Sequence, residues 1–543
     1  MKTLRFPYLI KLSCLLLGLA FFNSCKNPAE DVSIQVNTDI FKSPTVIQFE
    51  NANENASTPN NVSISFSGPG ASLVRTVTGG TNFNVSNGFI NIVLDRNANP
   101  TTGSPVKVTA TINAPGYAPT YLDLTFTDPK AKQFKTVKMF QYSRPAEGTA
   151  AVVKTQNLTG GQTSAPVTIS TTPNATQPQS TSLAIPASTS FKDAAGNVLN
   201  AAQLETRVIY TAVKSDGSIN QDVINKPIVN PVNENGQPIT GALNIMPIAS
   251  ASINMYAGNT EIKSFTNPIN LDMELPADFI NPITNAALKV GDTFDAWSIN
   301  EETGQWKKEG TASVVLNSAG KLVARKAITH LTIWEFVIPS VTYTGNITIT
   351  RNDAQYEEFF NVNGETVSLK EGESSKTIPT SITVYPSITV YPGADFTSRT
   401  VMVYSIDVNS YTEAFKILRI NSNNFNLTAN FTKKNSAIPA ELNLKFSCTN
   451  KNLTTSPNLA LKFENLTTKS SSIVSVDNGK ASGSVYNGES YRVFIEIDGV
   501  TYSTTFSVNN GTAEITGVQN LSASVTKVGA GFKVDATISK PCN

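Results

Sequence analysis

Residues 106–112 read VKVTATI, an alternation of apolar and polar side chains with a period of two. Because successive side chains of a β-strand point to opposite faces, this period predicts a strand with one face buried. Residues 62–66, VSISF, repeat the pattern, and clusters of Gly, Pro and Asn bound such stretches along the chain. No amphipathic helical pattern extends beyond two turns. We therefore expect an all-β protein built from tandem β-sandwich domains.

The N-terminus has the pattern of an export signal. A basic start precedes an apolar run from Leu12 to Phe22, which is too short to cross a bilayer as a stable helix. Ser24 and Cys25 follow, and this arrangement resembles the lipobox of bacterial lipoproteins, in which the cysteine is acylated and becomes the mature N-terminus. The resemblance implies a lipoprotein signal peptide at 1–24. The alternative is an ordinary secretory signal with an incidental cysteine.

Charge and hydropathy limit the classes of partner. The 543-residue chain has a formal net charge of +1, so it lacks the basic excess that nucleic-acid binding requires. No later segment reaches the roughly 18 consecutive apolar residues of a spanning helix. We expect an outer-membrane lipoprotein, on the periplasmic face or the cell surface. Its expected partners are the membrane, through the lipid, and a glycan or surface protein.

Length predicts three or four domains after the signal. Residues 155–182 carry almost no large apolar side chain, which favours a linker or a long excursion there. The predicted organisation is an immunoglobulin-like sandwich at 25–142, a Ser/Thr-rich linker at 143–182, a second sandwich at 183–340, a third at 341–435 and a transthyretin-like or immunoglobulin-like sandwich at 436–543.

Three stretches resemble known sandwich families. Residues 112–117, INAPGY, are similar to a strand turn of immunoglobulin-like modules in bacterial surface proteins. Residues 275–306, which include LPADFINP and WSINEETGQW, resemble the zonula-occludens and netrin-receptor sandwich and the related GAIN domain. This resemblance implies a hairpin with a tryptophan on each arm. Residues 479–497 resemble the transthyretin-like sandwich of carboxypeptidases, in which we expect the first and last strands to lie side by side.

Two cysteines remain once the signal and the lipid account for the others. An exported protein folds in an oxidising compartment, so Cys448 and Cys542 are predicted to form a disulfide. Closing a loop of that length stabilises the fold by up to about 4.7 kcal/mol in the chain-entropy model. The first and last strands of the final sandwich would carry the two residues. Two buried free thiols are the alternative.

The single histidine, His330, stands two residues before Thr332. In GAIN domains the tripeptide His-Leu-Thr is a self-cleavage site, so the resemblance implies His330 as the base, Thr332 as the nucleophile and a cut at the Leu331–Thr332 bond. Such receptor sites carry flanking cysteines, which this chain lacks. A residue two positions away also shares a strand face by default. We expect a structural histidine, and autoproteolysis is the alternative.

Other chemistry finds little support in the sequence. Trp297, Trp306 and Trp334 suggest a stacking platform for sugars, although large aromatics in a sandwich more often fill the core. Residues 95–99, DRNAN, imitate a calcium loop without its glycine and glutamate, so a turn is expected and no metal or cofactor is predicted. One histidine and no nucleophile elbow argue against a hydrolase. We therefore predict a non-enzymatic binding or scaffold protein, with an accessory module of a glycan-degrading system as a further alternative.

Overall fold

The computed structural model describes residues 34–37 and 41–541, except for 86–87, 214–218, 220–228, 241–242, 244, 282–285, 302, 340, 364, 385–398, 406–409, 413–414, 421–423, 435–436, 469 and 498–499. Strands β1 to β40 and one short 3-10 helix make up its regular structure, which confirms the prediction of an all-β protein with several domains. Within these described ranges, no helix is long and apolar enough to cross a membrane.

Unit 1, residues 41–142, packs a four-stranded sheet, β4-β5-β2-β8, against a three-stranded sheet, β3-β6-β7. Its core is the inner face of both sheets, including Ile47, Ile92 and Leu124. The alternation at 106–112 behaves as predicted, because Val108, Ala110 and Ile112 are buried. The elements are β2 (Lys42–Asn51), β3 (Ser63–Ser67), η1 (Ala71–Leu73), β4 (Val74–Thr76), β5 (Phe89–Leu94), β6 (Val106–Asn113), β7 (Thr120–Phe126) and β8 (Gln133–Met139).

Unit 2, residues 143–339, is one 13-stranded sheet with a large core and a second, smaller hydrophobic cluster, and the two-stranded ladder β18-β19 lies beside it. The main path of the sheet is β10-β11-β17-β22-β21-β20-β23-β15-β13-β9. The strands are β9 (Ala150–Asn157), β10 (Val167–Ser170), β11 (Thr181–Ile185), β12 (Phe191–Lys192), β13 (Gln203–Ala212), β14 (Val229–Val232), β15 (Ile245–Ala257), β16 (Thr260–Glu261), β17 (Ser264–Glu274), β18 (Ile280–Asn281), β19 (Ala286–Ala287), β20 (Thr293–Ile299), β21 (Gln305–Leu316), β22 (Leu322–His330) and β23 (Ile333–Pro339).

The predicted linker at 143–182 is wrong, because β9 and β10 lie within it and pair with β13 and β11 of unit 2. Small and polar side chains are sufficient in β9 and β10, because both strands lie at the edges of the sheet and need to bury little apolar surface. Threonine hydroxyls here are satisfied by backbone carbonyls: the Thr163 hydroxyl donates to that of Pro186 at 2.6 Å, and the Thr181 hydroxyl donates to that of Asp272 at 2.8 Å. A hydrogen-bonded hydroxyl can be buried at little cost.

Unit 3, residues 341–434, pairs the sheets β27-β24-β30 and β26-β25-β28-β29 around a small aromatic core. Residues 381–386 and 387–392 both read SITVYP. Strand β27 contains the first four residues of the first copy, and the second copy lies outside the described residues. The strands are β24 (Val341–Arg351), β25 (Glu358–Val362), β26 (Glu365–Leu369), β27 (Ser375–Val384), β28 (Arg399–Ser405), β29 (Phe415–Ile420) and β30 (Asn424–Phe431).

Unit 4, residues 437–541, packs β34-β33-β36-β37-β38 against β1-β32-β31-β40-β39, where β35 also joins β31. Its first and last strands, β31 and β40, are parallel neighbours as expected. Strand β1 (Ile34–Asn37), which precedes unit 1 in the sequence, adds to this unit beside β32. The other strands are β31 (Ile438–Cys448), β32 (Leu453–Ser456), β33 (Leu459–Asn465), β34 (Ser470–Val476), β35 (Lys480–Val485), β36 (Ser490–Ile497), β37 (Val500–Asn509), β38 (Thr512–Gln519), β39 (Ser522–Val528) and β40 (Gly531–Lys540).

Strand direction explains how the units are arranged. In units 1, 3 and 4 the first strand is parallel to the last, as for β2 and β8, so the chain enters at one end and leaves at the other. In unit 2 the first strand, β9, is linked to the last, β23, by three antiparallel pairings: β9 with β13, β13 with β15, and β15 with β23. The terminal strands therefore run in opposite directions, and the chain enters and leaves at the same end. Unit 2 therefore turns the chain around.

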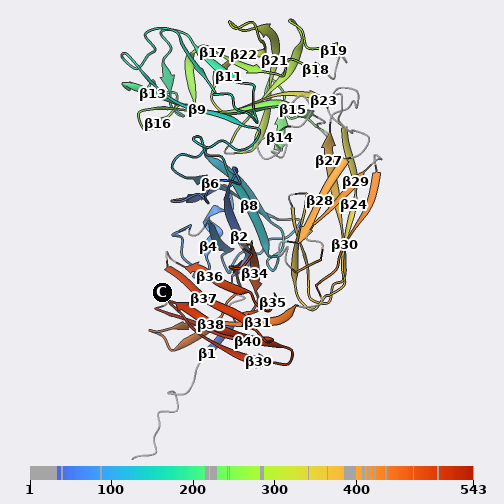
Figure 1. The fold of residues 1–543 in the computed structure, drawn as a ribbon. Coiled ribbons are helices and arrows are strands. Elements are labelled where there is room, and N and C mark those ends of the chain that lie inside the picture. Colours follow the sequence, from blue (N-terminus) through green and yellow to red (C-terminus); the bar gives the residue numbers. More distant parts are fainter. Residues whose placement is uncertain are drawn as a thin grey trace, which may run out of the picture.

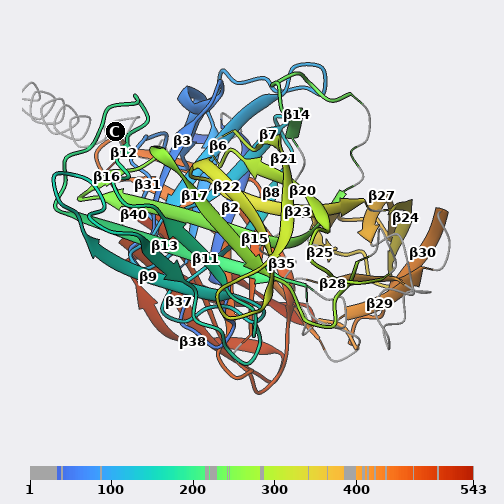
Figure 2. The ribbon, with the colours of Figure 1, turned by 90° about the horizontal axis from the view of Figure 1, so that it is seen from above.

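The figures show the result. Figure 1 places unit 2 at one extreme, unit 1 below it, and unit 4 with β1 at the other extreme. Unit 3 returns beside unit 1, with β24 and β30 running along the length of the molecule. Seen from above in Figure 2, unit 3 lies to one side of the other three units.

Candidate functional site at the joints between units

The histidine of the predicted cleavage tripeptide faces a carboxylate. His330 ends β22, and its Nε2 lies 3.7 Å from Glu309 Oε1 on β21. Its ring lies 5.0 Å from the ring of Trp334, measured between centroids. Burial lowers the pKa of His330 below its ordinary value of 6.5, and Lys307 lowers it further while Glu309 opposes the shift. Burial therefore favours the neutral form of the imidazole, which lies beside an aromatic ring.

The hydroxyl of Thr332 is engaged elsewhere. It is 7% exposed and donates a hydrogen bond to the carbonyl of Ile299, at the end of β20. The flanking backbone is bonded as well: Leu331 N donates to Lys263 at 3.0 Å, and Thr332 accepts from Ile253 N at 3.3 Å. Neither Leu331 nor Thr332 has a positive φ. This geometry joins two strands and does not present a nucleophile to His330.

The three tryptophans are buried in two clusters of unit 2: Trp334 in the main core, and Trp297 and Trp306 in the smaller one. Trp297, Trp306 and Trp334 are 2%, 1% and 1% exposed. The predicted hairpin is present, since β20 pairs with β21 and the rings of Trp297 and Trp306 lie 6.3 Å apart. A sugar ring cannot stack on side chains that solvent does not reach, so the stacking platform is wrong.

Several predicted features lie partly or wholly outside the described residues. The signal peptide at 1–24 and the lipidated Cys25 are among them, as is Cys542. Cys448 is buried at the end of β31 and takes part in a disulfide, but its pairing with Cys542 stays a prediction. Asp95 caps its own turn, accepting from Asn97 N at 3.0 Å and pairing with Arg75 at 3.2 Å. Within the described ranges, no group of three or more His, Cys, Asp or Glu could hold a metal ion.

The joint between units 1 and 2 contains the INAPGY motif. Gly116 has a φ of +80°, a conformation that favours glycine, and its carbonyl accepts from Tyr142 N at 3.1 Å, just after β8. Tyr142 is buried, and its hydroxyl donates to Asn254 of unit 2 at 3.5 Å. Burial raises the pKa of Tyr142 above its ordinary value. Ala118 packs with this tyrosine against Ala151 and Ile209 of unit 2.

The joint between units 1 and 4 is an apolar contact between two sheets. Every residue of β5, FINIVL, is buried, although a half-buried strand would bury alternate residues. Ile90, Ile92 and Leu94 face the core of unit 1. Phe89 faces unit 4 instead, where its ring lies 5.8 Å from that of Phe494 in an edge arrangement.

A polar contact completes this second joint. The side-chain carbonyl of Asn91, on the same face of β5 as Phe89, accepts from Ala460 N of unit 4 at 3.2 Å. Both groups are buried. The apolar contact covers surface, and this hydrogen bond in addition fixes the position of β33 on unit 1.

Three units meet around Lys132, which precedes β8. Its Nζ lies 2.9 Å from Glu357 of unit 3 and 3.7 Å from Asp477 of unit 4, and its side chain is 19% exposed. A second pair, Lys135 with Glu365 at 3.3 Å, also joins unit 1 to unit 3 but is more exposed. Partial burial makes the Lys132 pair the stronger of the two.

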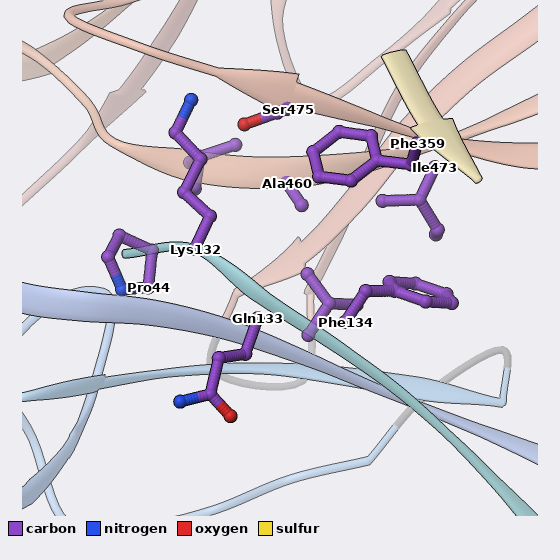
Figure 3. Close-up of a pocket in the computed structure, with 10 residues that line it drawn as sticks. Pro44, Lys132, Gln133, Phe134, Phe359, Ala460, Ile473 and Ser475 are labelled. Carbon is purple, nitrogen blue, oxygen red and sulfur yellow. The ribbon is translucent and has the colours of Figure 1, made fainter. Parts of the chain in front are cut away.

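A small pocket lies beside Lys132, and its walls come from all three units (Figure 3). Pro44 and Phe134 come from unit 1, Phe359 from unit 3, and Ala460 and Ile473 from unit 4. The lining is mostly apolar, and the polar side chains present, including Lys132, are few. The pocket is the incompletely filled centre of the three-unit joint.

Unit 3 has a buried ionic cluster at the end nearest this joint. Glu358 accepts from Lys433 Nζ at 2.7 Å, from Arg351 Nη1 at 2.9 Å and from the hydroxyl of Tyr411. Arg351 is fully buried and Lys433 is 7% exposed at the side chain. Burial and the neighbouring Glu358 raise the pKa of Tyr411. The cluster ties the ends of the first and last strands of unit 3 to β25.

The contacts described above join the units to one another. The joints were missed in the sequence because their partners are hundreds of residues apart, as with Phe89 and Phe494. One signal was available: the run FINIVL at 89–94, apolar except for Asn91, indicates a strand covered on both faces. The ionic cluster gave no sequence signal, since Arg351, Glu358 and Lys433 follow no spacing rule.

No protein-family model matches the chain. Among solved structures, the shaft pilin SpaA of Lactobacillus rhamnosus GG (D295N mutant) is 10% identical, with 31% of this chain and 95% of that chain covered and a TM-score of 0.15. A streptococcal ancillary pilin is 8% identical, with 47% and 95% covered and a TM-score of 0.14. The pilus adhesin SpaC of L. rhamnosus GG, in an open conformation, is 8% identical, with 92% and 56% covered and a TM-score of 0.15. Similarity at this level carries no argument about function.

Proposed function

We propose that the protein is a lipid-anchored, non-enzymatic outer-membrane protein in which units 1, 3 and 4 hold unit 2 away from the membrane. The observation that carries this proposal is that the two ends of the molecule are formed by unit 4 with β1 and by unit 2. Strand β1, the described segment nearest to Cys25, is paired with unit 4, whereas unit 2 lies at the opposite extreme (Figure 1). A lipid on Cys25 therefore leaves unit 2 as the part that meets a partner first.

The partner we propose for unit 2 is a glycan or another surface protein. Val290 and Leu316 are 58% and 55% exposed. Their segments are neighbours, because Gly291 N donates to Val314 at 3.0 Å. Loops on a rigid sandwich are common positions for binding residues. Thr332 is buried and its hydroxyl is bonded to the Ile299 carbonyl. Unit 2 therefore supports a binding role better than self-cleavage.

The anchor is tested by changing Cys25 to Ala in the expressed full-length protein. Acylation would place the native protein in the membrane fraction and allow it to incorporate a labelled fatty acid, because each buried methylene contributes about 0.8 kcal/mol to membrane binding. The variant should lose the label and leave that fraction. A native protein that incorporates no label would contradict the anchor.

The partner is tested with the soluble chain that begins at Lys26. We expect binding on a glycan array or to whole cell envelopes, with Val290→Glu weakening it and Val500→Glu, an exposed change in unit 4, leaving it intact. A reducing-sugar assay on the bound glycan separates the alternatives. Sugar release by the purified chain would contradict a non-enzymatic role and favour a glycan-degrading one.

A further inference from the structure

We propose that unit 1 has a mechanical function: it resists tension between the membrane anchor and a partner held by unit 2. The inference rests on the proposed function for the origin of that tension. Its structural basis is the pairing of β2 with β8, which runs over seven register pairs from Thr45↔Gln133 to Asn51↔Met139. These are the first and last strands of unit 1, so tension along the chain acts directly on this pair.

Tension would load the β2–β8 pair in shear. The start of β2 lies at the end near unit 4, where Pro44 lines the three-unit pocket. The end of β8 lies at the joint with unit 2, where Tyr142 packs against Ile209. The two strands are parallel, so pulling their opposite ends slides one along the other. The hydrogen bonds of a parallel pair are evenly spaced, and under shear they share the force and must yield together.

Both ends of the pair are closed by side chains, which opposes peeling. At the end near unit 4, the Ser43 hydroxyl donates to the Asp128 backbone carbonyl at 2.8 Å, and its backbone N donates to the Pro129 carbonyl at 2.7 Å. Ser43 is fully buried. Asp128 and Pro129 lie in the connection between β7 and β8, so this contact fastens the start of β2 to the segment that leads into β8.

At the upper end, Asn51 performs the same role. Its Nδ2 lies 2.9 Å from the Tyr117 hydroxyl, 3.2 Å from Gln141 Oε1 and 3.2 Å from the Ser57 carbonyl. Gln141 follows β8, and Tyr117 belongs to the INAPGY motif. Asn51 is 7% exposed, so its bonds compete little with water. It acts as a positioning residue that fastens the end of β2 to the segment after β8.

Unit 2 provides the internal contrast. Its terminal strands β9 and β23 are not neighbours and run in opposite directions. Pulling its two connections from the shared end would separate the bonds of edge strand β9 from β13 one after another. Units 3 and 4 have parallel terminal pairs like that of unit 1, but both units follow unit 2 in the chain. Unit 1 alone has this pair between β1 and unit 2.

Two pulling directions on the same folded chain test the proposal. Each uses the full soluble chain from Lys26 with one handle at its N-terminus, so lipidation has no influence on the result. The second handle is attached at Ser143→Cys, after β8, or at Lys130→Cys, before β8; both positions are exposed. The first direction shears β2 against β8, and the second unzips them from their common end.

We expect unit 1 to unfold in optical tweezers at a force several-fold higher in the Ser143→Cys geometry. Forced unfolding reports the unfolding rate under load, so equal equilibrium stability does not hide the difference. Asn51→Ala should lower the force in the shear geometry, whereas Asn113→Ala, at the exposed end of β6, should not. Equal forces in the two geometries would overturn the proposal whatever the outcome for Asn51→Ala.

Discussion

Units 1 and 2 bury apolar cores of the same kind but direct the chain differently. In unit 1 the first and last strands are parallel neighbours, and the chain passes through from end to end. In unit 2 they run in opposite directions, and the chain returns to the end at which it entered. When the first and last strands of a sandwich are parallel, as in unit 1, the next unit is placed at the opposite end. When they are antiparallel, as in unit 2, the chain comes back towards the units that precede it.

The largest loss of stability is expected in unit 3, where the ionic cluster joins the ends of the first and last strands to β25. Glu358→Gln removes the carboxylate that pairs with Arg351 and Lys433. Lys433 keeps Asp353 at 3.6 Å, whereas the charge of the buried Arg351 loses its paired carboxylate. Breaking a buried ion pair in this way costs about 3–5 kcal/mol. Chemical denaturation of the full chain should show an early transition for unit 3.

The exposed Glu371→Gln is the matched control for that change. A surface substitution of this kind should alter the free energy of unfolding by less than about 0.5 kcal/mol. If Glu358→Gln were equally silent, the ends of β24 and β30 would not depend on the cluster.

The next effect concerns the joint that stacks unit 1 on unit 4. Phe494→Ala removes a buried ring at the joint and should cost up to about 3 kcal/mol, at the low end for buried phenylalanines because the site is a boundary between units. A double-mutant cycle with Phe89→Ala measures the contact itself. The aromatic pair should couple by about 0.5–1.5 kcal/mol, and additive effects would show that units 1 and 4 are not in contact through these rings.

A smaller effect is expected at the break between β22 and β23. Thr332→Val removes the hydroxyl that donates to Ile299 and should lower the stability of unit 2 by about 1 kcal/mol. On a denaturing gel, native protein and variant should both run as one full-length band. If the native protein instead ran as two fragments and Thr332→Val as one full-length band, the autoproteolysis alternative would be supported.

The smallest effect is a pH dependence of unit 2. The pKa of His330 is lower in the folded protein than its ordinary 6.5, so the unfolded chain binds the extra proton first. Stability from the neutral imidazole is therefore complete above pH 6.5 and is lost as the pH falls toward the folded pKa. His330→Gln should flatten this dependence, measured as the free energy of unfolding between about pH 7 and 5.5. An unchanged slope would show that His330 does not titrate as described.

The alternation of side chains was enough to predict strands and an all-β fold, since burial of one face is a local property, as at 106–112. It failed at 143–182, where edge strands need few large side chains and buried threonines replace them. It also left the tryptophans open, because a sequence does not show which face of a hairpin is covered. Pairings such as β2 with β8 or β1 with β32 depend on contacts distant in the sequence, and no local pattern encodes them.

The most direct test of the account measures how far each end of the molecule lies from the membrane. The soluble chain is tethered by an N-terminal histidine tag to nickel-lipid vesicles that carry an acceptor dye, and a donor is placed at Ser318→Cys in unit 2 or at Lys451→Cys beside β32 in unit 4. Both positions are exposed. We expect strong energy transfer from Lys451→Cys and weak transfer from Ser318→Cys. Equal transfer from the two positions, or stronger transfer from unit 2, would contradict this expectation.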